Sequence, residues 1–535
     1  MTATVTRDAA LAVTTSRLAR AATLALGAVL IAACAFAFVG LNAEGYWTDE
    51  LFTLFLVNHH GGLAEVWRRA LTDTHPPLYY MLLYGWAQVF GLSEAALRAL
   101  SALFCVGAVA ILALGTRRAF SLNGRLFSGA VAATSPFWFM QSQNVRNYAL
   151  CLLAMSILAV LAIRVRQAQR ERGTVPAALV AGLALAGAVG AFSHFYAFLA
   201  TGLLYLYLIL TVPSWRLRAG LVAAGAVIFA AEVAYMRLLL RATQQNTHDM
   251  WFRADAPFFA HQTFEALQGL IGPGALVAIV ALLLAAPWRA RDRATPVRGR
   301  APEAAWIVGL GAFVVGGVIA AGVAISLIFA PSYSNMNLLI AGPFLWPALA
   351  LGFDAATARR PGAWAAVGLG VPALALVAQL ATQAERWLPR GEAWRESARL
   401  VLNQPGCAGQ PIPVLLPARF GPPTAFFRGL ARHDFYGFYF AGQDARLVPY
   451  RQDELVDPAR NPTLKARLAP GDCRVVAWAS HDINRRQALA LADRLSLAAG
   501  AAPGAVQAVT FETYRPVWTW PKRLQSTFVF LRRGP

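Results

Sequence analysis

The sequence has little charge. Only 14% of its 535 residues are charged, whereas an ordinary soluble protein has roughly 25%, and 57% of the residues are hydrophobic. This composition excludes a soluble globular protein. Lysine is almost absent, with only Lys465 and Lys522, so arginine supplies nearly all of the formal net charge of +20.

Cysteine is also scarce, and its spacing excludes the common metal and redox motifs. The five cysteines form no CxxC pair and no Cys/His cluster. Cys407 and Cys473 both follow the last apolar run, and the sequence leaves open whether they form a disulfide. Cys34 ends a sequence like a lipoprotein cleavage box, but the apolar run continues beyond it, which argues against cleavage there.

Charged residues are nearly absent from the middle of the apolar runs. Proteins that move ions or solutes usually carry such residues in mid-membrane. The sequence also lacks the internal repeat that is typical of secondary transporters. A transporter or flippase of a lipid-linked saccharide is the alternative to an enzyme, and both of these absences argue against it. A membrane anchor for a C-terminal binding domain would need far fewer apolar runs.

The arginines fall in short clusters between apolar runs of about 20 residues, as in the cytoplasmic loops of membrane proteins. This placement indicates membrane topology rather than a nucleic-acid-binding face. The positive-inside rule places every cluster up to Arg360 in the cytoplasm when the chain crosses the membrane eleven times. The predicted spans lie near residues 21–41, 95–116, 126–143, 147–163, 175–192, 195–212, 219–238, 265–287, 304–329, 336–353 and 362–382.

This topology requires that the apolar stretch 76–91 does not cross. Sixteen helical residues reach about 24 Å, less than the roughly 30 Å hydrocarbon core, so we expect an interfacial helix there. The loop 42–94, called the first loop below, and the loop 239–264 are then external.

The region after about residue 384 has a different composition, with both lysines, many prolines and short β-like runs around a helix-like stretch from Arg485 to Leu497. We therefore predict an all-α polytopic membrane domain (residues 1–383), with interfacial helices in the first loop, and a small external α/β domain (residues 384–535).

An acidic pair, Asp49-Glu50, follows the first span. A carboxylate in such a partly desolvated position could act as a general base. Alternatively, Thr48 or Asp49 could cap an interfacial helix that runs through Val57.

Four motifs in order resemble those of the polyprenyl-phosphate-sugar-dependent glycosyltransferases of the C-type superfamily. This group includes protein O-mannosyltransferases, the lipid A aminoarabinose transferase and the lipopolysaccharide-core galacturonosyl transferases. The motifs are Asp49-Glu50, His75-Pro76-Pro77 before an aromatic helix, Gly91-x-Ser93-Glu94-x3-Arg98, and Pro136-x4-Gln141-x4-Arg146-x-Tyr148.

The resemblance implies an inverting transfer of a sugar from a polyprenyl-phosphate donor to a glycan, lipid or protein acceptor. It also implies a multi-pass protein of the bacterial cytoplasmic membrane with its active site on the external, periplasmic face. Asp49 takes the role of the base, with Glu50 as its neighbour. The candidates for the donor phosphate are His75, Arg98, Arg146, Tyr148 and His194. Arg98 could instead extend to the interface, and His194 could cap a helix.

One departure from these relatives concerns the tenth span, where many of them carry an Arg-Tyr pair. This sequence has Tyr333 and Asn335 there, which could replace the missing contact. His248, with Asp249 and Arg253, could line the acceptor side. The sequence requires no cofactor, although Asp49, Glu50 and His75 could gather a divalent metal ion.

Overall fold

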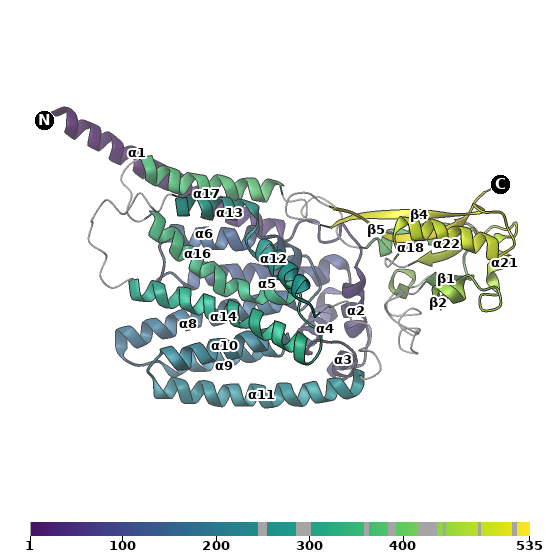
Figure 1. The fold of residues 1–535 in the computed structure, drawn as a ribbon, viewed down its shortest axis with the longest axis horizontal. Helices are drawn as coiled ribbons and strands as arrows, with labels where there is room; N and C mark the ends of the chain where they lie inside the picture. The colour runs from purple at the N-terminus through teal and green to yellow at the C-terminus, as the bar shows by residue number, and fades with distance from the viewer. Residues whose placement is uncertain are drawn as a thin grey trace.

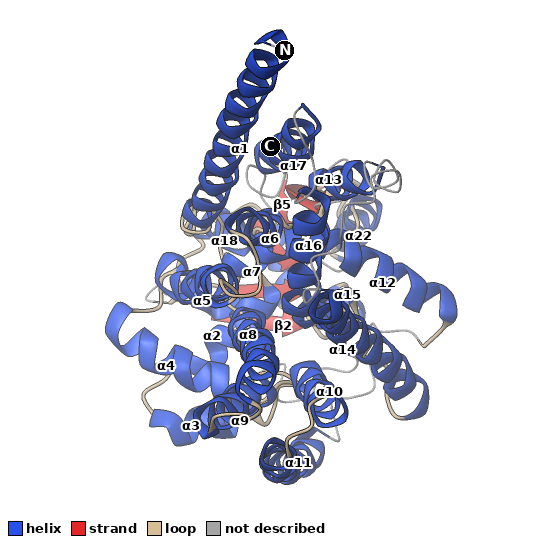
Figure 2. Ribbon diagram, turned by 90° about the vertical axis from the view of Figure 1, so that its left-hand side faces the viewer, coloured by secondary structure: helices blue, strands red, loops and turns tan. Residues whose placement is uncertain are grey.

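The computed structural model of the chain describes residues 2–243, 254–284, 301–357, 363–382, 392–415, 436–441, 446–479, 483–515 and 522–534. Long helices run side by side and form a bundle, and a smaller α/β domain lies beyond one end of it (Figure 1). An end-on view places α8 among the inner helices and α11 at the rim (Figure 2). Accordingly, α8 is mostly buried, while α11 is mostly exposed to its surroundings.

Helices lie at every predicted span. They are α1 (Thr2–Phe36), α5 (Glu94–Gly115), α6 (Leu122–Thr134), α7 (Pro136–Ser142), α8 (Tyr148–Arg172), α9 (Ala177–Ala191), α10 (Phe195–Thr211), α11 (Trp215–Thr243), α12 (Ala256–Ile271), α13 (Pro273–Leu284), α14 (Ala301–Ile328), α15 (Asn335–Leu338), η2 (Leu339–Ala341), α16 (Gly342–Thr357) and α17 (Ala363–Thr382). Among the described helices, five are long and apolar enough to cross a membrane, or six if the bent pair α12–α13 is one span. The multi-pass membrane architecture is confirmed, and the count of eleven crossings stays a prediction.

The predicted span at 265–287 is covered by two helices, α12 and α13, rather than by one straight helix. Helices α12 and α13 meet at an angle of 81°, because Gly272 adopts a left-handed φ of 78° and Pro273 follows it. The buried side chain of Gln379 (α17) satisfies backbone groups at this break. It accepts from the Ala275 N–H at 2.9 Å and donates to the Ile271 carbonyl at 3.3 Å.

The same Gln379 amide donates to the Thr134 carbonyl at 2.9 Å, at the break between α6 and α7. A membrane interior requires such internal partners for freed backbone groups.

The first loop folds into three short helices at the end of the bundle that faces the α/β domain (Figure 1). They are α2 (Thr48–Val57), α3 (Gly62–Ala70) and α4 (Leu78–Phe90). Helix α4 has 13 residues, about 20 Å of helix, so it is too short to cross a bilayer and fits the predicted interfacial helix.

The C-terminal domain has a five-stranded mixed sheet in the order β2-β1-β3-β5-β4. Its helices are α18 (Trp394–Leu402), α20 (Gln452–Leu455), α21 (Thr463–Leu468) and α22 (Arg485–Ala498), with a 3-10 helix, η5 (Tyr436–Phe440). The strands are β1 (Pro411–Leu415), β2 (Arg446–Tyr450), β3 (Val475–Ala479), β4 (Val506–Arg515) and β5 (Lys522–Arg532). Strand β1 pairs in parallel with β2 and β3, whereas β5 pairs antiparallel with β3 and β4. The predicted α/β fold is confirmed, and Cys407 and Cys473 form a disulfide.

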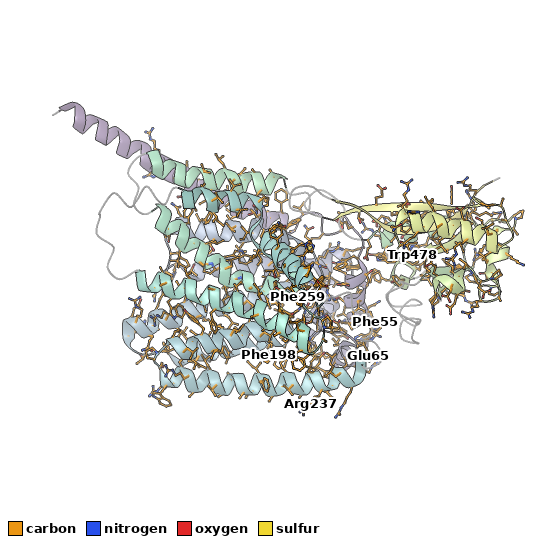
Figure 3. All side chains as sticks on the ribbon, in the orientation of Figure 1. Phe55, Glu65, Phe198, Arg237, Phe259 and Trp478 are labelled. Carbon is orange, nitrogen blue, oxygen red and sulfur yellow. A yellow bond between two sulfur atoms is a disulfide. The ribbon has the colours of Figure 1, made fainter. Side chains whose placement is uncertain are left out.

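The first loop and the C-terminal domain share one hydrophobic core. Tyr46 from the loop belongs to the same buried cluster as Trp394 and Trp478, and its ring packs on Phe438 with centroids 5.8 Å apart. Trp478 lies in the sheet domain, away from Phe198 in the helical bundle (Figure 3). The shared core joins the domain to the loop that carries the acidic pair.

Candidate active site

The side chains of the acidic pair have different environments. Helix α2 starts at Thr48 and its N-cap residue is Trp47, so neither Thr48 nor Asp49, the two caps considered, holds the cap position. The Asp49 side chain is 49% exposed, whereas that of Glu50 is fully buried. Only Asp49 can therefore meet a substrate directly.

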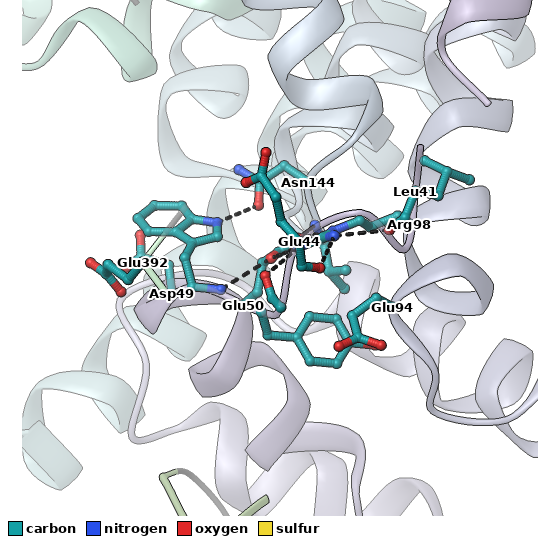
Figure 4. Close-up of polar contacts among 12 residues, drawn as sticks. Leu41, Glu44, Asp49, Glu50, Glu94, Arg98, Asn144 and Glu392 are labelled. Carbon is teal, nitrogen blue, oxygen red and sulfur yellow. Dashed lines mark hydrogen bonds and ion pairs between the residues drawn. The ribbon is translucent and has the colours of Figure 1, made fainter. Parts of the chain in front are cut away.

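Glu50 is held by an extensive polar network (Figure 4). Arg98 binds both of its carboxylate oxygens, at 2.9 and 2.5 Å, and the backbone N–H of Val145 donates to Oε1 at 2.8 Å. The remaining N–H groups of Arg98 donate to the carbonyls of Leu41, Glu44 and Gly45, each at 2.9 Å. All five guanidinium N–H groups of Arg98 are thus used within the protein, so none is left for a phosphate. Glu50 and Arg98 shape the first loop.

Arg146 lies beside the exposed acid. Its Nη2 is 3.9 Å from Oδ2 of Asp49, and its Nη1 donates to the Asp49 carbonyl and to the Thr53 hydroxyl, both at 3.3 Å. The buried Nε–H of Arg146 has no hydrogen-bond acceptor among the described residues. Arg146 therefore combines a positive charge with a free donor next to Asp49.

Three aromatic side chains from separate elements gather near Arg146. The ring of His194 lies 5.1 Å from those of His75 and Tyr148, centroid to centroid, and His75 lies 6.3 Å from Tyr148. The structure thus brings together His75, Arg146, Tyr148 and His194 as the resemblance implied.

His194 both caps a helix and faces this cluster. Its Nδ1 accepts the Tyr196 N–H at 3.0 Å, at the start of α10, so a neutral ring carries its proton on Nε2. The buried Nε2 has no partner within the described part of the chain. Burial, followed by the charges of His75 and Arg146, lowers the pKa of His194 well below its usual value. The ring is therefore neutral near pH 7, and its Nε2–H is the N–H donor that it brings to the cluster.

Asp73 lies two residues before His75 and was not among the site residues expected from the sequence. Its buried carboxylate is 3.3 Å from Nδ1 of His75, accepts the Thr74 N–H at 2.7 Å and accepts the Tyr80 hydroxyl. Burial alone would raise the pKa of Asp73, but His75, Arg146 and these hydrogen bonds hold it below its usual range. Asp73 orients His75 and balances the positive charge beside it.

The segment that leads into α15 and forms it contributes to the site a different residue from those expected. The Tyr333 hydroxyl pairs with Thr263 at 2.5 Å, and the Asn335 amide donates to Glu265 at 3.0 Å, so both side chains contact α12. Asn337 instead reaches the cluster, where its Oδ1 accepts the Tyr148 hydroxyl at 3.4 Å. The predicted contact His248 lies outside the described residues.

The three residues considered as metal ligands do not converge. Glu50 faces Arg98, and the part of the chain that the structure describes holds no group of three His, Cys, Asp or Glu residues able to bind a metal ion.

The arrangement pairs a half-exposed carboxylate with a cluster of cationic and hydrogen-bond-donating groups. A carboxylate can accept a proton from an attacking hydroxyl or amine, and the donors can stabilise negative charge that develops on a leaving group. The site therefore suits the displacement of an anionic leaving group.

Residues 74–236 match the sequence model of the dolichyl-phosphate-mannose-protein mannosyltransferase family, and no curated protein sequence gives a significant match to the chain. In fold, the chain is similar to ArnT from Cupriavidus metallidurans bound to undecaprenyl phosphate, with 13% identity, a TM-score of 0.51 and coverage of 94% of this chain and 97% of ArnT. The apo state of that protein gives 15% identity, a TM-score of 0.50 and coverage of 95% and 98%.

Proposed function

Because the chain is a multi-pass membrane protein with the fold of the C-type glycosyltransferases, we propose that it is an inverting glycosyltransferase that uses a polyprenyl-phosphate sugar. The observation that carries the proposal is the pairing of the exposed Asp49 with the buried Arg146. The undecaprenyl phosphate named for the similar ArnT structure supports this class of donor.

In the proposed reaction the carboxylate of Asp49 accepts the proton of the acceptor hydroxyl or amine. The acceptor atom bonds to the anomeric carbon while the bond from that carbon to the phosphate oxygen breaks. The electron pair of the broken bond stays on the phosphate, which leaves as an anion. Arg146, His75 and the Nε2–H of His194 stabilise that charge, and Tyr148, held by Asn337, lines the same side.

The proposed donor carries a hexose or a pentose, and the acceptor is an envelope glycan, a glycolipid or a protein. We place the reaction at the external face of the bacterial cytoplasmic membrane, because the arginine clusters favour an external first loop. None of the proposed steps needs a cofactor.

The proposal is tested by incubating the purified protein with a panel of undecaprenyl-phosphate-linked pentoses and hexoses and with envelope glycolipid acceptors. We expect release of undecaprenyl phosphate and gain of one sugar mass on one acceptor. Envelope glycolipids from a deletion strain should lack the same mass by mass spectrometry, and the strain should accumulate the donor. Unchanged glycolipids and glycoproteins, with no turnover of any donor, would contradict the proposal.

A further inference from the structure

Glu392, in the C-terminal part of the chain, contacts the first loop. It lies two residues before α18, and three donors among the described residues hydrogen-bond to its carboxylate. The donors are the Thr48 N–H at 2.6 Å, the Thr48 hydroxyl at 2.5 Å and the Trp394 indole N–H at 2.8 Å. Two of these three donors belong to the residue directly before Asp49.

These contacts complete the start of helix α2. The first N–H groups of a helix have no intrahelical acceptor, and Trp47 at the N-cap offers no side-chain acceptor in its place. Glu392 accepts from Thr48, while Glu50 accepts the Trp47 N–H at 3.3 Å. The negative charge of Glu392 also lies at the positive end of the α2 dipole. In the close-up, Glu392 and Asp49 are neighbours at this helix start (Figure 4).

The region around Glu392 is itself fixed on the first loop. Arg395 donates to the carbonyls of Asn42 and Ala43 at 3.0 and 2.8 Å and pairs with Glu94 at 3.2 Å. Tyr439 donates to the same Glu94 at 3.0 Å. The part of the C-terminal domain that carries Glu392 is therefore attached to the first loop by several hydrogen bonds besides those of Glu392.

We propose that Glu392 is a positioning residue through which the C-terminal domain sets the start of α2 and so the place of Asp49. This inference rests on the proposed function. A general base must lie within hydrogen-bond reach of the proton that it takes, and a misplacement of about 1 Å can lower the rate about 100-fold. The domain thus contributes to the catalytic step although its side chains are not the base.

The test compares Glu392→Ala and Glu392→Gln with the wild type, with the undecaprenyl-phosphate sugar that the wild type turns over as the probe. Alanine removes the acceptor, so we expect kcat to fall about 10- to 100-fold while KM for the donor stays within about twofold. Glutamine keeps an oxygen that accepts from Thr48, so it should retain at least about a third of the wild-type kcat. Glu396→Ala is the matched control. Glu396 lies in α18, four residues after Glu392, and its carboxylate pairs with Arg395 at 2.9 Å and not with α2.

A Glu392→Ala variant with wild-type kcat would overturn the inference, and so would a glutamine variant as inactive as the alanine variant. If Glu392→Ala does not fold, Glu392→Asp carries the test, since it withdraws the carboxylate by one methylene and should lower kcat in the same way. Absence of donor turnover by the wild type would instead contradict the proposed function. The two failures are therefore distinguishable.

Discussion

Arg98 donates two hydrogen bonds to the carboxylate of Glu50, from Nε to Oε1 at 2.9 Å and from Nη2 to Oε2 at 2.5 Å. Both side chains are almost fully buried. Successive helical residues point in different directions, so this pair turns Glu50 into the interior and leaves Asp49 facing outward. The Asp-Glu sequence thus divides into a residue that shapes the loop and a residue that is available for chemistry.

Breaking this ion pair should destabilise the protein. Glu50→Gln would leave the buried Arg98 charge without its carboxylate, and the loss of one partner of a buried pair costs about 3–5 kcal/mol. We expect a clearly lower thermal midpoint for Glu50→Gln in detergent. Arg68→Gln is the control, because Arg68 pairs with Glu65 while 68% exposed, and an exposed pair contributes about 0–1 kcal/mol. Equal midpoints for Glu50→Gln and the wild type would contradict the structural role.

Arg146 should matter for the donor phosphate more than for folding. Its nearest carboxylate, that of Asp49, is half-exposed and remains hydrated when the guanidinium is removed. Hydrogen bonds to a charged group contribute about 1.5–3 kcal/mol, so Arg146→Ala should weaken binding of undecaprenyl phosphate roughly 10- to 150-fold.

Arg146→Lys should fall between Arg146→Ala and the wild type, because lysine keeps the charge and loses the forked geometry. The measurement is the concentration of undecaprenyl phosphate that half-inhibits turnover. Equal inhibition of all three proteins would remove Arg146 from the donor site.

His194 should make stability depend on pH. Its folded pKa is depressed, chiefly by burial, so the unfolded chain binds a proton below about pH 6.5 that the folded protein does not bind. The free energy of unfolding therefore falls as the pH decreases below that value, by about 1.4 kcal/mol per unit until the folded pKa is reached.

The matched variant is His194→Asn, because asparagine also caps a helix and has no ionisable group. Between pH 7.5 and pH 5.5 the thermal midpoint of the wild type should decrease more than that of the variant. A decrease of the same size in both proteins would show that other groups cause it.

Much of the fold could be predicted from the sequence, because apolar runs and arginine clusters are local signals. The short β-like runs of the sequence, PVLLPA, CRVVAWAS and STFVFLRR, coincide with β1, β3 and β5, whereas β2 and β4 are not among them. Strand β2 contains a proline, Pro449, and proline usually argues against a strand. The break in the predicted span at 265–287 had a signal in Gly272-Pro273 that hydropathy alone does not use.

The site was predictable only in part, since its contacts join residues far apart in the chain. The motifs selected Asp49 and Arg146, which are 97 residues apart. No local pattern shows that the N–H groups of Arg98 are all used, that Asn337 contacts Tyr148, or that Glu392 contacts α2 across 344 residues. These assignments need the packed structure.

The eleven-span topology predicts which loops an external reagent reaches. Single cysteines introduced at Asn58, in the first loop, and at Thr463, in the C-terminal domain, should react with a membrane-impermeant thiol reagent in intact cells. A cysteine at Arg293, in the arginine-rich stretch of sequence predicted to be cytoplasmic, should react only after permeabilisation. Reaction of all three sites in intact cells would contradict the topology.

The final prediction concerns the base. Asp49→Asn keeps the size of the side chain and much of its hydrogen bonding but cannot accept a proton, and loss of a general base lowers the rate about 10²–10⁴-fold. The side chain caps no backbone N–H and is half-exposed, so the thermal midpoint and the inhibition by undecaprenyl phosphate should stay near those of the wild type. Turnover of an undecaprenyl-phosphate sugar by Asp49→Asn, Glu50→Gln and the wild type, each corrected for the folded fraction, separates the two acids. Near-normal turnover by Asp49→Asn would leave the proposed reaction without its base, whereas loss of turnover with donor binding intact would assign the proton transfer to this carboxylate.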